Sequence, residues 1–359
     1  MSSAGKPLEQ PWLSSVWVDG LFVLSPPFLA LLLVASFPGV FKSTATMPLV
    51  YWVLLVVMVD VAHVYSTLYR TYFRSSSVKQ RPMLLVIPLL CYVAGVLLYA
   101  VDGLIFWRIL AYLAVFHFIR QQYGFMRLYS RHERQSKLHR SIDALAVYTA
   151  TIYPLLYWHL AGGRQFNWFV DGDFLVFKSE FLLQLSGYIY GCVIAVYALK
   201  ELQMLARVRK INLPRNLIVA GTLLSWYFGI IYYNGDMAFT TLNVVSHGIP
   251  YMALIWITEQ QRVKNRALAE RTMLKAVYKP YTGVLIFVLG LVLLAYVEEG
   301  LWDGLVWREH TPVFAIFKNL PLIHDSAALA LLVPLLSLPQ STHYILDGFI
   351  WKRTKQEHQ

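Results

Sequence analysis

The sequence predicts an all-α membrane protein, a polytopic transmembrane helical bundle with about ten spans. Of its 359 residues, 57% are hydrophobic and 14% are charged, with a mean hydropathy of +0.51, whereas about a quarter of residues are charged in soluble proteins. The apolar residues form runs of about 20, the length that crosses a hydrocarbon core of about 30 Å. These runs are uniformly apolar rather than alternating, which excludes a β-barrel.

The apolar runs, bounded by charged residues, Gly and Pro, divide a single transmembrane domain of residues 1–359 into its elements. The expected spans lie near 21–41, 48–69, 83–101, 104–124, 143–161, 181–199, 216–234, 238–257, 281–298 and 326–350. Asp102-Gly103 and Gly235-Asp236 are expected to be tight turns between neighbouring spans. The longer connections are basic and follow every second span, which places all of them on the same side of the bundle; they are 70–82, 125–142, 200–215 and 258–280.

Charge gives the expected topology. The net charge of +11 would suggest a nucleic-acid partner in a soluble protein, but membrane proteins concentrate Lys and Arg in cytoplasmic loops. Most of the 31 basic residues fall on one side of ten spans, including Lys6 and the residues after 351, so we expect both termini in the cytoplasm and no nucleic acid. Residues 1–20 lack the pattern of a cleavable signal peptide, so the first span is expected to be retained. Segment 125–142 is expected to contact anionic lipid headgroups.

The sequence lacks the motifs of several common kinds of protein chemistry. Cys91 and Cys192 lie inside apolar segments, so the sequence has no CxxC pair and no disulfide framework. It also has no P-loop, GxGxxG, GxSxG or HExxH motif. The histidine boxes of membrane desaturases and alkane hydroxylases are missing as well.

Ionisable groups inside four apolar runs are the strongest functional signal, because such groups are costly at membrane depth. The histidines are His63, His117, His247 and His343. Each has a polar companion three or four residues away, on the same helix face. In the same order, the companions are Asp60, Gln121, Asn243 and Asp347.

This pairing fits a metal site, because a ligating imidazole needs its second nitrogen hydrogen-bonded, or a carboxylate as a further ligand. All four histidines lie in even-numbered spans, which run in the same direction and place them at similar depth in the cytoplasmic half of the bilayer. We therefore expect the four imidazoles to converge on a metal. The alternative is that each histidine only holds two helices together by a hydrogen bond.

Asp60 and Asp347 are the carboxylates that the sequence places well inside the membrane, where an ionised group needs a cation. A metal is one such cation, and Arg70 and Arg120 are the alternative partners. Pro250 and Pro339 each lie near a histidine and are expected to bend their spans.

The four histidine-bearing helices resemble the bacterial membrane β-carotene 15,15′-dioxygenase family, of the Brp/Blh type. The matching positions are His63, the pair His117-Phe118, His247, and His343 through Asp347 with Phe349. The match covers the neighbourhoods of these motifs rather than the whole chain, and Asp60 precedes His63 where the family has an Asp after its first His. The resemblance implies a non-haem Fe(II) centre that activates O₂, a lipid-soluble polyene substrate and a bacterial cytoplasmic membrane.

Together these features favour a membrane metalloenzyme, an iron-dependent oxygenase or oxidoreductase, that acts on a hydrophobic substrate drawn from the bilayer. Zinc or copper would also suit four imidazoles. Two other functions stay open: a proton-coupled transporter that uses the buried Asp and His residues, and a non-catalytic membrane scaffold. The sequence does not give the oligomeric state.

Overall fold

All regular structure in the described part of the chain is helical, as the sequence predicts. The computed structural model describes residues 10–42, 47–74, 77–209, 211–265, 272–279 and 281–351, and it has no strand in these ranges. Lys6 and the basic residues after 351, which support the expected topology, lie outside the described residues.

The described residues form sixteen α-helices and five helical segments of π or 3-10 type. In chain order they are α1 (Val16–Asp19), η1 (Gly20–Leu24), α2 (Pro26–Ser36), α3 (Pro38–Phe41), α4 (Leu49–Trp52), η2 (Val53–Val61), α5 (Ala62–Arg70), α6 (Ser77–Gln80), α7 (Met83–Val101), α8 (Gly103–Tyr129), α9 (Lys137–Ala161), α10 (Glu180–Val208), α11 (Leu213–Trp226), η3 (Tyr227–Tyr232), α12 (Asp236–Asn265), α13 (Thr272–Val277), α14 (Thr282–Trp302), η4 (Asp303–Trp307), η5 (Ala315–Phe317), α15 (Ser326–Leu336) and α16 (Leu338–Ile350).

A helical segment lies at each of the ten expected span positions, but fewer of them meet the length and composition needed to cross a membrane. Among the described residues five do: Leu49–Arg70, Met83–Val101, Gly103–Tyr129, Glu180–Arg207 and Thr282–Trp307. The number rises to seven if two bent helix pairs each count as one span. Helices α9, α11 and α12 do not qualify by composition, because polar residues such as Asp143, Arg215 and Asn243 lie along them. Ten crossings and cytoplasmic termini therefore stay predictions.

The two bent pairs have local causes. Val16–Leu24 and Pro26–Ser36 meet at 50°, and Ser326–Leu336 meets Leu338–Ile350 at 42°. Each second helix begins with proline, at Pro26-Pro27 and at Pro339, where the missing N–H has no role in the helix that follows. The bend expected at Pro339 is thus present, whereas α12 continues as a helix through Pro250.

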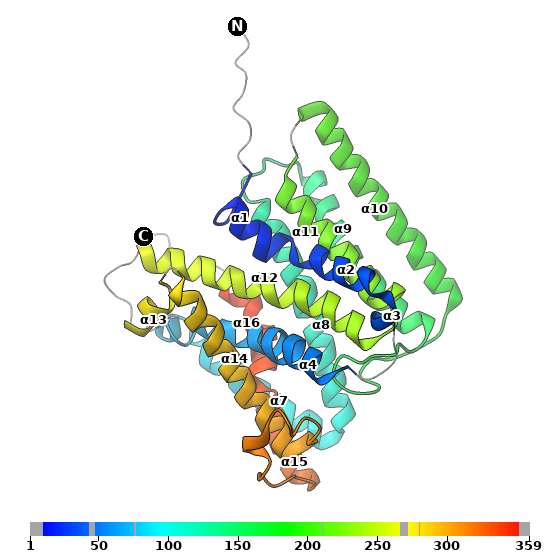
Figure 1. The fold of residues 1–359 in the computed structure, drawn as a ribbon. Helices are drawn as coiled ribbons and strands as arrows, with labels where there is room; N and C mark the ends of the chain where they lie inside the picture. The colour runs from blue at the N-terminus through cyan, green and yellow to red at the C-terminus, as the bar shows by residue number, and fades with distance from the viewer. Residues whose placement is uncertain are drawn as a thin grey trace.

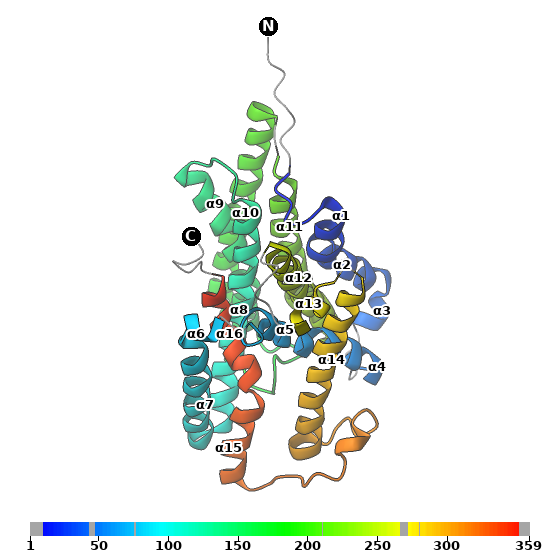
Figure 2. The ribbon, with the colours of Figure 1, turned by 90° about the vertical axis from the view of Figure 1, so that its left-hand side faces the viewer.

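Helix α12 runs through the middle of the molecule (Figure 1). It packs against α2 and α11, and also against η2, α5 and, more lightly, α8. Helix α16 contacts α5, α7 and α8, and α10 lies at the periphery, where it packs on α9 (Figure 1). The view in Figure 2 shows α7, α15 and α16 together on one side of the molecule and α14 on the other. Helices α5, α8, α12 and α16 therefore meet in the interior.

Candidate metal centre

The structure brings the four predicted histidines together in the interior. His63 lies in the first turn of α5, His117 in α8, His247 in α12 and His343 in α16. Each histidine is only 1% exposed. Their candidate ligand atoms, one from each ring, all lie within 4.8 Å of one another.

The inward-facing nitrogens are too crowded to be satisfied by hydrogen bonds between the rings. His117 Nε2 lies 3.2 Å from His247 Nε2 and 3.1 Å from His343 Nε2, and His247 Nε2 also lies 3.1 Å from His63 Nε2. An imidazole nitrogen carries either one proton or one lone pair in the ring plane, so a single Nε2 atom cannot serve two partners well. One cation that accepts a lone pair from each ring would satisfy all four.

The spacing also fits a metal. Nitrogen ligands bind first-row metals such as zinc at about 2.0–2.1 Å, which in a tetrahedral site separates neighbouring ligand atoms by about 3.3–3.4 Å. Three of the six separations between the four Nε2 atoms are slightly shorter, at 3.1–3.2 Å, and all four candidate ligand atoms lie within 4.8 Å of one another. The residues present therefore fit a four-imidazole metal site.

On the outer side of the rings, three of the four Nδ1 atoms have a polar neighbour. His343 Nδ1 lies 2.7 Å from Thr67 Oγ1, His117 Nδ1 lies 3.5 Å from an oxygen of Asp347, and His63 Nδ1 lies 3.7 Å from an oxygen of Asp60. The hydrogen bond of His343 holds the proton on its Nδ1 and leaves the Nε2 lone pair for a metal. The carboxylates beside His117 and His63 are too far for a hydrogen bond, but their charge favours a proton on the Nδ1 atom that faces them. Asp347 was expected beside His343 on its own helix, but it faces His117 of α8 instead.

A hydrogen-bonded chain fixes the tautomer of His343. The carboxylate of Asp347 can only accept, so Tyr251 donates its hydroxyl proton to it, at 2.8 Å. The Tyr251 oxygen then accepts from Thr67 at 3.3 Å, and the Thr67 oxygen accepts from His343 Nδ1–H. Trp351 also donates to Asp347, at 2.7 Å. The His343 lone pair therefore points to the centre.

The sequence analysis did not identify Thr67, Tyr251 and Trp351 as members of this hydrogen-bonded network. The sequence pattern could have indicated two of them, because Tyr251 follows His247 by one helical turn and Thr67 follows His63 by one turn. Hydroxyl groups are common in membrane helices as packing contacts, and only the fold shows that these two meet.

The ring of His247 is held by stacking instead of by a hydrogen bond. Its Nδ1 has no hydrogen-bond partner among the described residues. The Phe118 ring lies parallel to it, with 3.5 Å between ring centroids, and Trp168 packs edge-on against Phe118. Asp173 holds the loop that carries Trp168 by accepting from three successive backbone N–H groups, at Trp168, Phe169 and Val170. These aromatic rings keep water from this side of the centre.

A glycine lets α12 approach η2 and α5 closely enough for His247 to reach His63. A Cβ atom added at Gly248 would lie 2.9 Å from Val59 Cγ1 and 3.1 Å from the Val59 carbonyl oxygen. Both distances are shorter than an ordinary contact between such atoms. The hydrogen at this position therefore helps set the short separation between the His247 and His63 Nε2 atoms.

Gln121 and Asn243 do not orient imidazole rings, which corrects the expectation for both. Gln121 donates its amide to the backbone carbonyl of His247, at 2.9 Å. Asn243 donates to the carbonyl of Phe239 one turn earlier on its own helix, at 3.0 Å. Sequence spacing placed these residues near a histidine, but their side chains bind main-chain groups, which are the nearer acceptors. Gln121 still positions His247 through its backbone.

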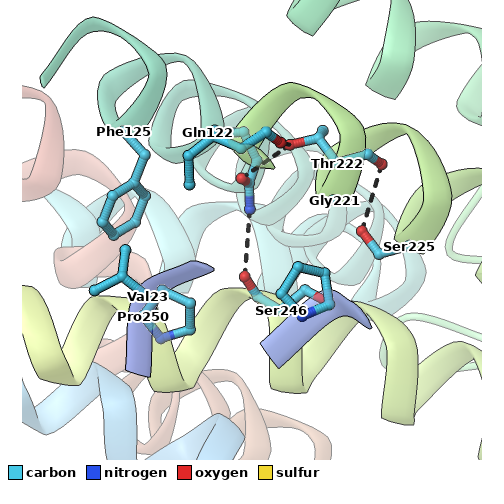
Figure 3. Close-up of a pocket in the computed structure, with 10 residues that line it drawn as sticks. Val23, Gln122, Phe125, Gly221, Thr222, Ser225, Ser246 and Pro250 are labelled. Carbon is cyan, nitrogen blue, oxygen red and sulfur yellow. Dashed lines mark hydrogen bonds between the residues drawn. The ribbon is translucent and has the colours of Figure 1, made fainter. Parts of the chain in front are cut away.

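Proline at position 250 leaves the Ser246 carbonyl without its usual helical donor. Gln122 of α8 donates to this carbonyl at 3.5 Å and accepts from Thr222 of α11 at 3.1 Å. Figure 3 shows these groups around a cavity of about 10 Å³, lined also by Ser225, which is room for roughly one water molecule. Helix α12 thus continues without a break through Pro250, and the freed carbonyl finds a donor on α8.

The proposed arginine partners of the buried aspartates form other contacts. Arg70 pairs with Glu259 at 2.9 Å and lies 4.0 Å from the ring centre of Trp351, and Arg120 donates to the Tyr148 hydroxyl at 2.5 Å. Among the ion pairs of the described residues, Asp60 and Asp347 each pair with a histidine of the centre. Arg70 and Arg120 both lie close enough to Asp347 to interact electrostatically with its carboxylate, so the expected arginine partners are its neighbours without a direct ion pair among the described residues.

Glu298 is a further buried carboxylate near the centre. The span expected at 281–298 ends at this residue, whereas α14 continues past it and buries its side chain. It accepts from the Tyr65 hydroxyl at 2.5 Å and from the Gln340 amide. Tyr65 belongs to the helix of His63 and Gln340 to that of His343, so Glu298 links two histidine-bearing helices.

No protein-family profile, no curated protein and no solved structure matches this chain.

Proposed function

We propose that this protein is a membrane-embedded metalloenzyme whose metal is held by His63, His117, His247 and His343. The observation that carries the proposal is the convergence of four buried Nε2 atoms, which hydrogen bonds alone do not satisfy. The Nδ1 contacts on the far side of three rings support it, because they favour the tautomer that a ligand needs.

The carboxylates beside the four histidines support a divalent metal ion as the occupant of the site. Four neutral imidazoles leave a divalent metal with two positive charges, and charge is costly in a membrane interior. Asp60 and Asp347, each in contact with a ligating ring, supply two negative charges.

The reaction class that we propose is oxidation of a lipid-soluble substrate by a non-haem iron oxygenase or oxidoreductase, in keeping with the resemblance to the membrane β-carotene dioxygenase family. Fe(II) held in this way would supply an open coordination position for O₂. The chain itself holds the four rings, keeps their lone pairs inward through Asp347, Tyr251 and Thr67, and excludes water with Phe118. A carotenoid or another long apolar molecule from the bilayer is the proposed substrate.

The test is the metal content of the detergent-purified protein, measured by elemental analysis for the wild type and for the single variants H63A, H247A and H343A. We expect about one iron per chain in the wild type and a large loss in each variant. A matched control is H139A, which changes a histidine outside the centre. Zinc or copper in place of iron would correct the metal, and wild-type protein without stoichiometric metal would refute the centre.

A proton-coupled transporter is the second candidate, favoured by the carboxylates of Asp60, Glu298 and Glu299 inside helical segments long enough to cross a membrane. Transport would require uptake into proteoliposomes that depends on a pH gradient and is lost in D60N. The metalloenzyme instead requires O₂ consumption that depends on an apolar substrate and on His247. If neither activity nor bound metal is found, the four histidines serve only to hold the helices together.

A further inference from the structure

A groove of about 420 Å³ opens between α9 and α10, a volume typical of small-molecule sites. The residues that line it come from the first two turns of α9 and from the second half of α10. Helix α10 is long and apolar enough to cross a membrane, and few residues of its apolar stretch are buried. It lies at the edge of the molecule, beside α9 (Figure 1). The groove therefore faces the surrounding lipid.

Four of the residues that line the groove are apolar. Leu138 and Ile142 lie one helical turn apart on α9, and Val196 and Leu199 lie about one turn apart on α10. Leu138 is 67% exposed and Leu199 is 65% exposed, so their side chains can contact a further apolar molecule. The hydrocarbon chain of a lipid is the apolar partner that surrounds a membrane helix.

Lys200 also lines the groove, although its side chain is only 4% exposed. It belongs to a buried ion-pair cluster, in which it pairs with Asp143 and Glu201. Arg215 pairs with the same two carboxylates and with Glu133. Three carboxylates and two cations leave the cluster with one net negative charge. Lys200 therefore joins α10 to α9 and does not by itself attract an anion.

The end of the groove at the start of α9 is strongly basic. Asp143 pairs with Lys200, whereas Tyr153 stacks on Tyr190 with 4.5 Å between ring centroids, so α9 and α10 run antiparallel and the start of α9 lies beside the end of α10. The two helix ends expose four basic residues, Lys137, Arg140, Arg207 and Arg209, and neither 134–142 nor 202–209 contains Asp or Glu. Their positive charge exceeds the single negative charge of the buried cluster and attracts an anion.

His139 and Gln203 complete the lining of the groove. Both side chains carry N–H groups that can donate to phosphate oxygens. Arg207 follows Gln203 by one helical turn and lies on the same face of α10. Basic pockets between membrane helices bind anionic lipid headgroups, and here the basic end is continuous with an apolar lining.

We propose that the groove binds one anionic phospholipid, whose phosphate lies between His139 and Gln203 and whose acyl chain follows the apolar lining. A soluble phosphate compound would leave the apolar lining uncovered, and a lipid without net charge would leave the positive charge without a partner. Segment 125–142 is expected to contact headgroups in general, whereas the groove holds a single lipid in a defined place. The proposal does not depend on the metal centre.

The test measures lipid binding to the purified full-length protein in detergent by native mass spectrometry, which counts the lipids bound to each chain. The probes are palmitoyl-oleoyl phosphatidylglycerol, which is anionic, and phosphatidylcholine with the same chains, which carries no net charge. The main variant is Q203E, which places a negative charge beside the phosphate and keeps the side-chain size. Its matched control is Q184E, the same change at an exposed glutamine of α10 about 28 Å away along the helix.

We expect the wild type to bind one phosphatidylglycerol at least tenfold more tightly than phosphatidylcholine. Q203E should weaken that binding about tenfold, and Q184E should leave it unchanged. R207Q should weaken it about fivefold, the usual contribution of one basic residue to binding an anionic lipid surface. Gln203 is exposed, so Q203E should melt at the wild-type temperature without lipid, and R207Q tests the same site independently.

Equal affinities of the wild type for the two lipids would overturn the proposal. Wild-type binding of phosphatidylglycerol in both Q203E and R207Q would overturn it as well, and so would equal losses in Q203E and Q184E. Displacement of the lipid by excess glycerol phosphate would identify a soluble phosphate compound as the ligand, which also contradicts a lipid site.

Discussion

Replacing Gly248 with alanine should weaken metal binding although the new methyl group touches no ligand atom. The added Cβ would lie 2.9 Å from Val59 Cγ1 and 3.1 Å from the Val59 carbonyl oxygen. Carbon atoms pack best at about 3.5–4.0 Å, so α12 must move away from η2 by about half an ångström. His247 and His63 sit next to this contact, and their Nε2 separation of 3.1 Å would widen by a similar amount.

Forcing a methyl group into a well-packed interior costs about 1–3 kcal/mol. If most of that cost is relieved by binding metal less tightly, the dissociation constant rises about 5- to 150-fold, since 1.4 kcal/mol corresponds to a factor of ten. The assay is competition for Co²⁺ against a chelator of known affinity, with the wild type and G248A measured side by side.

The matched control is Gly124 of α8, where a Cβ would meet no atom within 4 Å. Alanine there should leave metal affinity unchanged and stabilise the helix by about 0.5–1 kcal/mol. Wild-type affinity in G248A would refute the reasoning, because the approach of α12 to η2 would then not set the ligand geometry. Equal losses in G248A and G124A would refute it as well.

Four further outcomes follow from the structure. T67V should lower metal affinity about 10- to 100-fold because His343 loses the partner of its Nδ1, whereas T67S should retain wild-type affinity in the same competition assay; equal affinities of the two variants would contradict the assigned tautomer. D347N should lower affinity by a similar factor through His117, and a normal Co²⁺ spectrum and affinity in D347N would contradict that role. D173A should lower the melting temperature, because three backbone N–H groups lose their acceptor at about 1 kcal/mol each, and an unchanged melting curve would show that the loop is held by its aromatic contacts. Removing the metal with a chelator should lower the melting temperature of the wild type but not of H247A, since a ligand stabilises only the state that binds it.

The sequence predicts the helical class and the positions of the segments well, because long apolar runs have one main structural solution in a membrane. The run expected at 83–101 is α7 in the structure. The number of crossings is harder to predict, since α9, α11 and α12 place polar residues against other helices rather than against lipid. Their composition alone does not separate a span from a buried helix.

The four histidines could be found from the sequence because each interrupts an apolar run. Their partners could not, because spacing along one helix shows only neighbours on that helix. Asp347 follows His343 by one turn but contacts His117, and Thr67 reaches His343 from another helix. Glu298 was missed because the end of an apolar run does not show whether a helix continues beyond it.

X-ray absorption spectroscopy of the purified, metal-loaded protein tests the central claim most directly, because it counts the atoms bound to the metal. The account predicts about four nitrogen neighbours at about 2.0–2.1 Å, with the outer-ring scattering typical of imidazole, and the loss of about one such neighbour in H247A. A metal surrounded mainly by oxygen, or a spectrum that H247A leaves unchanged, would contradict a centre built from His63, His117, His247 and His343.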